Sequence, residues 1–361
     1  MSMTRTWILR TSAVLFGLAA GVLIAVPLEF AARYVKSRSL RLEPATWVAD
    51  PDLIYRLNPS NPEFPCSFRG KPPGAMKDPE ALAVCLGEST TYGHDVTEWE
   101  AWPRVTERVL RSHGVRAEVV NAGVPGYGMH QLLLRYRREI AALQPDFVVV
   151  YAGWNRTGAL VDSLEWVPFG ITRPGDGQLR RAQLWLAGHS LLFRKALQYL
   201  AAERSEWLSP EWVIDPYHET YVEDLRALAT EISARHQRPV LILYPALYYE
   251  GIAQEEMSTY EPMLWERRKL KPEMVAELQR KHAAIRGVAR ETGAALIDVQ
   301  EALAGLHGQE RMDLFTDEMH LTARGNRKVG QIIGDALADI IARQPPATRL
   351  ARTAVNASCA P

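Results

Sequence analysis

Apolar residues along this chain form two kinds of pattern, short continuous runs and longer stretches with helical spacing. The short runs, each of a length suited to a buried strand, are residues 81–86, 117–121, 147–151, 240–244 and 294–298. Helical spacing covers residues 101–113, 129–143, 221–236, 274–292 and 323–343. Because strands alternate with helices, we expect an α/β fold with a doubly wound parallel sheet of five strands and right-handed crossovers.

Two long segments interrupt this alternation, and both are rich in aromatic side chains. One covers about residues 157–216 and carries four tryptophans, and the other covers residues 246–271. Connections of this length are uncommon unless they act as lids or binding loops. The aromatic residues either pack the insertions onto the sheet or line a cleft for a sugar or acyl group. We therefore expect one main domain over residues 80–344 with two lid-like insertions.

The N-terminus carries an uncharged, apolar stretch at residues 11–28, which is just long enough to cross a bilayer as a helix. The residues from Pro27 onward do not match a small-x-small cleavage site, which favours an uncleaved anchor in residues 1–36 over a signal peptide. Basic residues lie on both sides of the stretch, but large downstream domains translocate largely regardless of charge. We expect a single N-terminal transmembrane helix and an extracytoplasmic main domain.

The segments on either side of the main domain show no clear periodicity. Residues 37–79 are rich in proline, which predicts a stalk and lead-in rather than a separate domain. Residues 345–361 carry no pattern and are predicted to form a disordered tail.

Composition excludes some classes of function. The chain holds 42 basic and 42 acidic residues, so no net positive charge indicates a nucleic-acid partner. Its three cysteines are Cys66, Cys85 and Cys359, an odd number without close spacing, which predicts neither a disulfide framework nor a metal site. Cys85 lies in the first apolar run and is interpreted as a small buried hydrophobic residue.

The first predicted strand ends on a glycine, and a serine follows two residues later. Gly87 allows a sharp turn of the backbone, so Ser89 is lifted out of the sheet at its carboxyl edge. Open α/β sheets bind their ligands at this edge. A serine in such a place more often caps a helix than attacks a substrate, so its role depends on the later segments.

Polar segments follow the second, third and fifth predicted strands. They read NAGVPGYG at residues 121–128, AGWN at residues 152–155 and TDEMHL at residues 316–321. Loops after the first three strands open on the same edge of a parallel sheet, so Ser89, Gly123 and Asn155 are expected to converge there.

Each of these segments offers a group that acyl chemistry requires. Ser89 needs a base to become a nucleophile, and the imidazole of His320 is suited to that task. Asp317, three residues earlier, can hold the imidazole in the correct tautomer. The oxyanion would be bound by three donors, the backbone N–H groups of Ser89 and Gly123 and the side-chain amide of Asn155. Two further histidines near these segments, His94 and His130, are interpreted as loop residues.

The ordered set G-E-S-T, N-A-G-x-P-G-Y-G, A-G-W-N and D-E-M-H-L resembles the GDSL/SGNH hydrolase family. The four blocks extend from Gly87 to His320. The resemblance implies a flavodoxin-like sheet, ester hydrolysis through an acyl-enzyme on Ser89, and no metal or organic cofactor. Two positions depart from the family pattern. Glu88 precedes the serine where aspartate is usual, and Arg156 follows Asn155 where aspartate is frequent, and neither position belongs to the triad.

From these features we expect a membrane-anchored SGNH-type serine esterase that removes a small acyl group. The expected partners are the membrane and an ester substrate, which is either an acylated envelope glycan or a small acyl ester. The same acyl-enzyme could instead pass its acyl group to a polysaccharide hydroxyl, which would make the protein an O-acyltransferase. A third possibility is a non-catalytic envelope scaffold that retains the fold. The sequence indicates no particular protein partner.

Overall fold

A computed structural model describes residues 26–31, 46–50, 53–155, 220–264 and 272–343, together with isolated positions between 178 and 193. The chain divides into two compact units. The first unit comprises residues 1–45, 49–55 and 166–209, and the second comprises residues 46–48, 56–165 and 210–361. The predicted tail at 345–361 lies outside the described residues, as do Arg156 and most of the insertion at 157–216.

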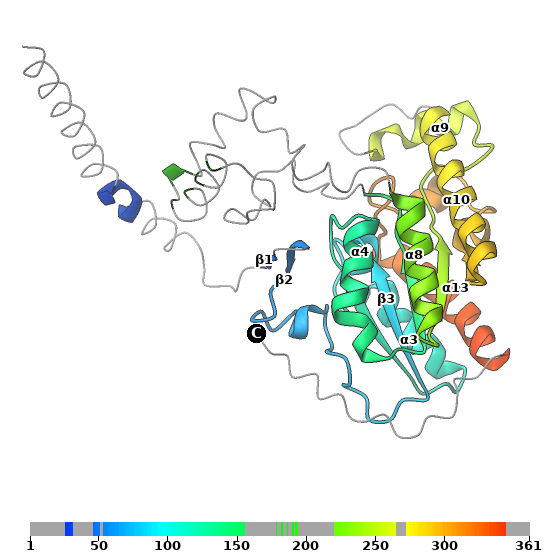
Figure 1. Ribbon diagram of the computed structural model, residues 1–361. Helices are drawn as coiled ribbons and strands as arrows, with labels where there is room; N and C mark the ends of the chain where they lie inside the picture. Colours follow the sequence, from blue (N-terminus) through cyan, green and yellow to red (C-terminus); the bar gives the residue numbers. More distant parts are fainter. Residues whose placement is uncertain are drawn as a thin grey trace, which may run out of the picture. The chain divides into compact units, whose positions relative to one another are not determined.

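In the first unit, residues 26–31 are helical (Figure 1). One carboxylate of this helix binds a segment that is distant in the sequence. Glu29 accepts hydrogen bonds from the Ser190 hydroxyl and the Leu192 N–H, both at 2.9 Å. The apolar stretch at 11–28 lies outside the described residues apart from its last three positions. Among the helices that are described, none is both long enough and apolar enough to cross a membrane.

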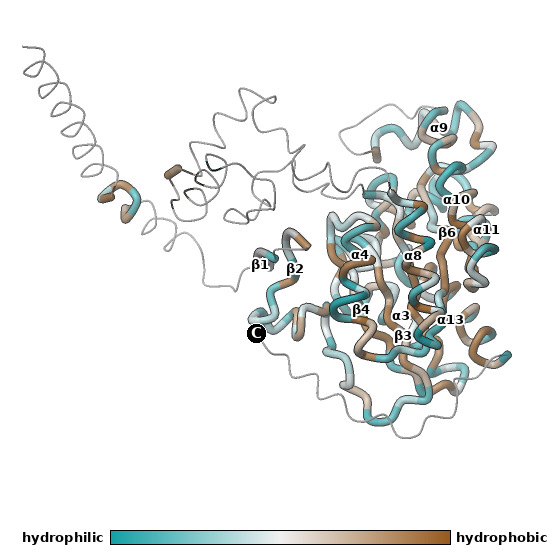
Figure 2. The backbone as a smooth tube through the Cα atoms, viewed as in Figure 1, coloured by the Kyte–Doolittle hydropathy of each residue, from teal (hydrophilic) through white to brown (hydrophobic). Residues whose placement is uncertain are grey.

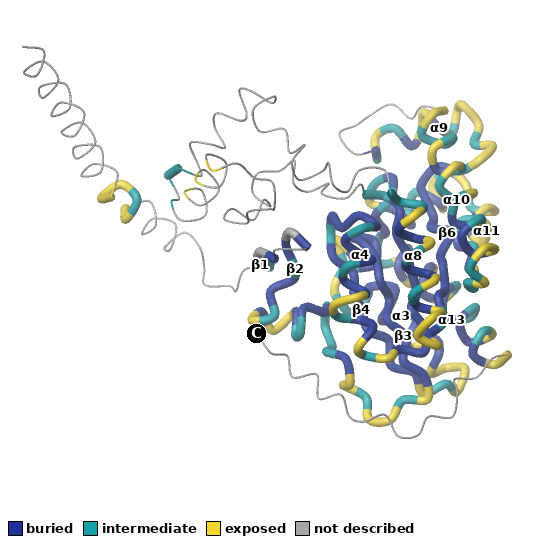
Figure 3. Tube along the Cα trace, viewed as in Figure 1, coloured by how far each residue is buried: buried dark blue, intermediate teal, exposed yellow. Residues whose placement is uncertain are grey.

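A parallel five-stranded sheet forms the centre of the second unit, in the order β4-β3-β5-β6-β7. This order and the parallel direction confirm the predicted flavodoxin-like, doubly wound arrangement. Every residue of β4, β3 and β5 is buried, because helices cover both faces of the sheet (Figures 2 and 3). The strands are β3 (Ala81–Gly87), β4 (Ala117–Gly123), β5 (Phe147–Tyr151), β6 (Arg238–Leu243) and β7 (Ala295–Asp298).

Helices cover the sheet in two layers. The chain runs from β3 outward to β4, whereas every later connection in the sheet runs in the opposite direction. Right-handed crossovers therefore place the helix between β3 and β4 on one face and the helices of the later connections on the other. One layer contains α3 (Trp102–Ser112) and α13 (Ala323–Arg343), which pack together. The other contains α4 (Met129–Arg135), α8 (Tyr221–Ala234) and α10 (Pro272–Thr292), with α8 packed against both neighbours (Figure 1).

The shorter helices connect these layers and lie in the loops. The helix predicted at 129–143 begins as α4 but continues as a π-helical turn (Tyr136–Ile140) and a 3-10 turn (Ala141–Leu143). The second insertion, at 246–271, is described up to residue 264. The remaining elements are α2 (Ser89–Tyr92), α9 (Gln254–Tyr260), α11 (Val299–Ala302), α12 (Gly308–Met312), and the 3-10 turns Pro65–Ser67 and Glu261–Met263.

The lead-in before the sheet is more ordered than a stalk. Strands β1 (Trp47–Asp50) and β2 (Ile54–Leu57) pair in a small sheet, and residues 56–79 belong to the second unit. Phe64 and Phe68 are buried, and the Arg69 guanidinium donates to the carbonyl oxygens of Gly93 and Val96, at 2.5 Å each. This part of the predicted stalk therefore belongs to the domain, because a few buried aromatic residues attach it without any periodic pattern.

The cysteines behave differently from one another. Cys85 is free and fully buried, as predicted, and burial raises the pKa of its thiol. Cys66 is disulfide-bonded, so the expectation that the chain forms no disulfide is wrong. Spacing along the chain does not reveal which distant segments the fold brings together, which is why the count of cysteines was misleading.

Candidate active site

Ser89 is the first residue of α2, directly after the turn that ends β3. Gly87 and Gly123 are paired in register at the carboxyl ends of β3 and β4. A Cβ atom on Gly87 would lie 2.2 Å from Thr91 Oγ1, and one on Gly123 would lie 2.1 Å from the Tyr92 backbone nitrogen. Two glycines are therefore required so that α2 can sit directly against the strand ends and hold Ser89 above them.

Three side chains form a continuous hydrogen-bonded chain at this edge of the sheet. Ser89 Oγ lies 2.8 Å from His320 Nε2, and His320 Nδ1 lies 2.6 Å from Asp317 Oδ2. Ser89 and His320 are each 8% exposed, so the hydroxyl and the ring are shielded from bulk water. The structure thus brings together the three residues that the sequence predicts as nucleophile, base and orienting acid.

A tight turn sets the geometry between Asp317 and His320. Asp317 Oδ1 accepts the backbone N–H groups of Met319 and His320, at 2.8 and 2.7 Å, while Oδ2 faces the ring. The Thr316 N–H donates to the His320 carbonyl at 2.8 Å and closes the turn. Burial by itself raises the pKa of Asp317, but hydrogen bonds and charge interaction with His320 outweigh it and hold that pKa below its ordinary value. The carboxylate is therefore ionised and accepts the Nδ1 proton.

Asn155 offers a free amide to the same site. Its Nδ2 atom is buried and has no hydrogen-bond partner among the described residues. A buried amide nitrogen without a partner is costly, which is typical of a group that binds a ligand. The Asn155 amide can therefore bind a ligand, as its predicted role as an oxyanion donor requires. Arg156, the next residue, lies outside the described part.

Glu88 holds the backbone of the loop that carries Asn155. Its Oε1 atom accepts the N–H groups of Gly153 and Asn155, at 3.0 and 3.3 Å, and its Oε2 atom accepts the Trp154 N–H at 3.2 Å. The side chain is fully buried, and burial raises the pKa of Glu88 to about 7 against the lowering effects of these hydrogen bonds and of Lys281. Sequence reasoning noted Glu88 only as a departure from aspartate and missed this contact.

The predicted role of Gly123 does not fit its surroundings. Its N–H already donates to Asn121 Oδ1 at 2.9 Å, and the absent side chain makes room for α2. The backbone N–H groups of Ser89 and Gly126, in contrast, have no hydrogen-bond acceptor among the described residues. Gly126 has a φ of 76° in the turn after β4, where glycine is favoured. The N–H of Gly126 can therefore bind a ligand, whereas that of Gly123 is already bound.

His94, for which the sequence predicts only a loop position, lies beside the predicted base. Its ring lies 4.9 Å from the ring of His320, between centroids, and its N–H donates to the Ser89 carbonyl at 3.0 Å. Partial burial and the nearby His320 both lower the pKa of His94. His130, in contrast, lies 3.3 Å from Asp224 and pairs α4 with α8. Only the position of His94, just after α2, could have indicated its place beside the base.

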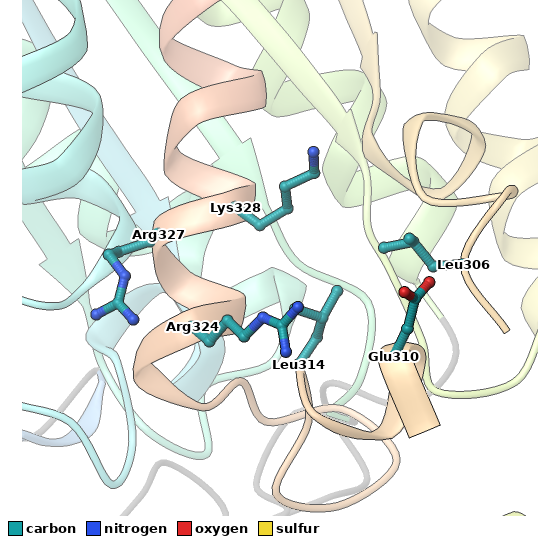
Figure 4. A pocket seen from close by; sticks show the side chains of 6 residues that line it. All are labelled: Leu306, Glu310, Leu314, Arg324, Arg327 and Lys328. Atoms are coloured by element: carbon teal, nitrogen blue, oxygen red, sulfur yellow. The ribbon is translucent and has the colours of Figure 1, made fainter. Parts of the chain in front are cut away.

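The described surface also contains a hollow of about 370 Å³ at the start of α13. Its cationic groups do not converge, because Arg324 pairs with Asp313 at 2.8 Å and Arg327 points away from Glu310 (Figure 4). No group of three or more His, Cys, Asp or Glu side chains in the described residues could hold a metal ion. The lining residues are Leu306, Glu310, Leu314, Arg324, Arg327 and Lys328, and none belongs to the triad.

Comparison with known proteins places this site in a family. The model of the GDSL-like lipase/acylhydrolase family matches residues 85–328, a span that includes Ser89 and His320. This span covers more than half of the chain, so the protein belongs to the GDSL-like lipase/acylhydrolase family. The match also supports the broad class of esterase or hydrolase. Among curated proteins, no sequence match was found.

Solved structures with a similar fold have low sequence identity to this chain. The acetyl xylan esterase AlAXEase is 16% identical, with a TM-score of 0.45, over 71% of this chain and 99% of the other. A lipase/acylhydrolase from Enterococcus faecalis is 18% identical, with a TM-score of 0.43, over 74% and 100%. The acetylxylan esterase Axe2 from Geobacillus stearothermophilus is 17% identical, with a TM-score of 0.42, over 74% and 97%. At these values the comparisons carry no information about the substrate.

Proposed function

We propose that this protein is a serine ester hydrolase of the SGNH type that works through an acyl-enzyme on Ser89. One observation carries the proposal: the Ser89 hydroxyl, the His320 ring and the Asp317 carboxylate form one chain of hydrogen bonds, with contacts of 2.8 and 2.6 Å. A serine activated by a base that a third group orients is the arrangement that nucleophilic catalysis requires. A scaffold without activity would not need it.

The geometry supports a definite order of proton transfers. Because Asp317 accepts the Nδ1 proton, His320 presents the lone pair of Nε2 to the Ser89 hydroxyl. As Ser89 Oγ attacks the ester carbonyl, His320 takes its proton and then gives it to the departing alcohol oxygen. Water enters next, loses a proton to His320 and breaks the acyl bond to Ser89, which regains its proton.

Negative charge on the carbonyl oxygen needs donors that are already in place. Asn155 Nδ2 is buried without a partner, and the N–H groups of Ser89 and Gly126 have no acceptor among the described residues. We assign these three groups to the oxyanion hole, with Gly126 in place of Gly123, whose N–H is taken by Asn121. Donors fixed before the reaction stabilise the transition state without having to reorganise.

We also propose a class of substrate and a cellular location for the enzyme. The apolar stretch at 11–28 is long enough for an uncleaved membrane anchor, and the disulfide at Cys66 is typical of an oxidising compartment. We propose an anchored enzyme with an extracytoplasmic catalytic domain that removes small acyl groups from an envelope glycan or a related ester. Alkaline phosphatase fused at the C-terminus tests this topology, because it is active only after export.

Activity is tested with the full chain in detergent micelles. Hydrolysis of p-nitrophenyl esters from acetate to decanoate measures the preferred acyl length, and acetylated oligosaccharides test the glycan. We expect turnover that is highest with acetate, and covalent labelling of Ser89 by a fluorophosphonate probe. A Ser89→Ala protein that is labelled as strongly as the parent would falsify the proposed nucleophile. Addition of a sugar acceptor distinguishes transfer from hydrolysis, because transfer yields an acylated sugar in place of free acid.

A further inference from the structure

The loop that presents Asn155 is bound to its surroundings through its own backbone. Its three N–H groups, from Gly153 to Asn155, all donate to the carboxylate of Glu88. Two of its carbonyl groups are bound by tyrosine side chains. The Tyr221 hydroxyl donates to the Ala152 carbonyl at 3.0 Å, and the Tyr244 hydroxyl donates to the Gly153 carbonyl at 3.3 Å.

Lys281, on α10, makes the shortest of the contacts to this loop. Its ammonium group donates to the Gly153 carbonyl oxygen at 2.6 Å, whereas its salt bridge to Glu277, one helical turn earlier, is longer at 3.4 Å. The side chain of Lys281 is 28% exposed, so most of it is packed away from water. Hydrogen bonds from a charged donor are stronger than those between neutral groups. The geometry thus makes Lys281 the main support of the Gly153 carbonyl.

The shape of the loop depends on a glycine at position 153. Gly153 has a φ of 144°, a conformation that residues with side chains rarely adopt, and a Cβ atom there would lie 2.6 Å from the ring of Tyr244. A glycine backbone is flexible, so its conformation depends on the groups that bind it. Asn155 lies two residues further along, and any rotation at Gly153 moves its amide.

Lys281 also balances a charge that the fold buries completely. Glu88 is 0% exposed and faces Tyr151 on β5, Tyr221 on α8, Tyr244 after β6 and Lys281 on α10. Lys281 is the only cation among these neighbours, and its charge lowers the pKa of Glu88 against the effect of burial. Both oxygens of the ionised carboxylate can accept hydrogen bonds, whereas protonation converts one of them to a hydroxyl group.

We propose that Lys281 is a positioning residue for ester hydrolysis, which holds Asn155 Nδ2 in place by binding the Gly153 carbonyl and by keeping Glu88 in its ionised, three-bond form. The inference rests on the proposed function, because it assumes that Asn155 stabilises the oxyanion. Lys281 touches neither the substrate nor Ser89, so it acts only through the loop. No sequence motif points to it, because it lies on a helix far along the chain from Asn155.

The test compares Lys281→Met with Lys281→Arg in the full chain. Methionine keeps the apolar stem without the donor and the charge, and arginine keeps both. We expect Lys281→Met to lower kcat about tenfold or more with little change in KM, because loop displacement weakens oxyanion binding but not substrate binding. Lys281→Arg should recover at least part of this loss. Lys328→Met on α13 removes an exposed lysine and serves as the matched control, with kcat unchanged.

Two further measurements separate positioning from a general loss of structure. In the double variant Asn155→Ala/Lys281→Met, kcat should equal that of Asn155→Ala alone, because Lys281 has no effect once its target amide is gone. The acid side of the pH profile of kcat should also move to higher pH in Lys281→Met, because Glu88 then takes up a proton more readily. Full additivity in the double variant, or a Lys281→Met protein with parental kcat and pH profile, would overturn the inference.

The test of Lys281 can fail without refuting the proposed esterase function. Turnover by the parent protein and its loss in Ser89→Ala test the esterase assignment alone. If the parent hydrolyses esters and Lys281→Met behaves like it, only the role of Lys281 is refuted. If the parent protein hydrolyses no ester and is not labelled by the probe, the esterase proposal itself is refuted.

Discussion

The Ser89 hydroxyl and the His320 ring, 231 residues apart along the chain, lie 2.8 Å apart across the carboxyl edge of the sheet. Ser89 reaches this place because two glycines allow α2 to rest on the strand ends, and His320 because a tight turn precedes α13. The packing of α13 against α3, the helix that follows α2 in the chain, supports this contact. Several consequences of this arrangement can be measured.

Replacement of Ser89 by alanine should abolish ester hydrolysis and probe labelling. The hydroxyl is the only group that His320 Nε2 binds in the described residues, so no second nucleophile can replace it. We expect kcat to fall by about 10⁴-fold or more, as measured by p-nitrophenyl acetate hydrolysis. Ser258→Ala, which alters an exposed serine on α9, is the control and should keep full activity.

Replacement of Asp317 by asparagine should lower kcat by roughly 10²- to 10⁴-fold with a smaller effect on folding. The amide can still accept the Met319 and His320 N–H groups through one oxygen, so the turn is preserved. Its NH₂ group, however, would face His320 Nδ1 and favour the tautomer with the proton on Nε2, which cannot deprotonate Ser89. Steady-state kinetics combined with a thermal melt measures both effects, and an unchanged kcat would remove Asp317 from the triad.

Replacement of Asn155 by alanine should lower kcat by about 10²- to 10³-fold. The Nδ2 atom has no partner among the described residues, so its removal breaks no internal hydrogen bond, and we expect the melting temperature to stay near the parental value. Pre-steady-state measurement of acyl-enzyme formation provides the most direct readout. A variant that acylates at the parental rate would show that the amide does not bind the oxyanion.

Glu88 should make stability and activity respond to pH in opposite directions. Its pKa in the folded protein is about 7, above the ordinary value of 4.5, so the folded state binds the proton more tightly than the unfolded state. Its contribution to stability is therefore fully present below pH 4.5 and is lost as pH rises through about 7. Activity should rise over the same interval, because the ionised carboxylate holds the Asn155 loop through both oxygens.

Glu88→Gln removes this titration and isolates its effect. The difference in melting temperature between the parent and Glu88→Gln should change between pH 4.5 and 7, with the parent losing stability relative to the variant as pH rises. Glu301→Gln, on α11, is a control for the loss of a carboxylate at an exposed position. A difference that stays constant over this range would show that Glu88 does not titrate there.

Periodicity alone predicted most of the sheet. The run FVVVY at 147–151 is a strand with the predicted bounds, because a continuous β-branched run has few alternatives when both faces are covered. The flavodoxin-like arrangement followed only from the family resemblance, because right-handed crossovers alone leave more than one strand order open. The lead-in was harder to predict, because Phe64 and Phe68 attach it through contacts that form no repeating pattern.

The sequence by itself determined the type of fold, and it identified Ser89, Asp317, His320 and Asn155 as candidates, because chemistry-bearing residues followed predicted strands in a recognisable order. Only the tertiary structure decided how the backbone groups around them are used. Gly123 makes room for α2 and has its N–H bound by Asn121, while Glu88 accepts N–H groups of the Asn155 loop and Lys281 donates to its Gly153 carbonyl. Such roles depend on hydrogen bonds between segments that are distant in the chain, and these form only when the layers pack.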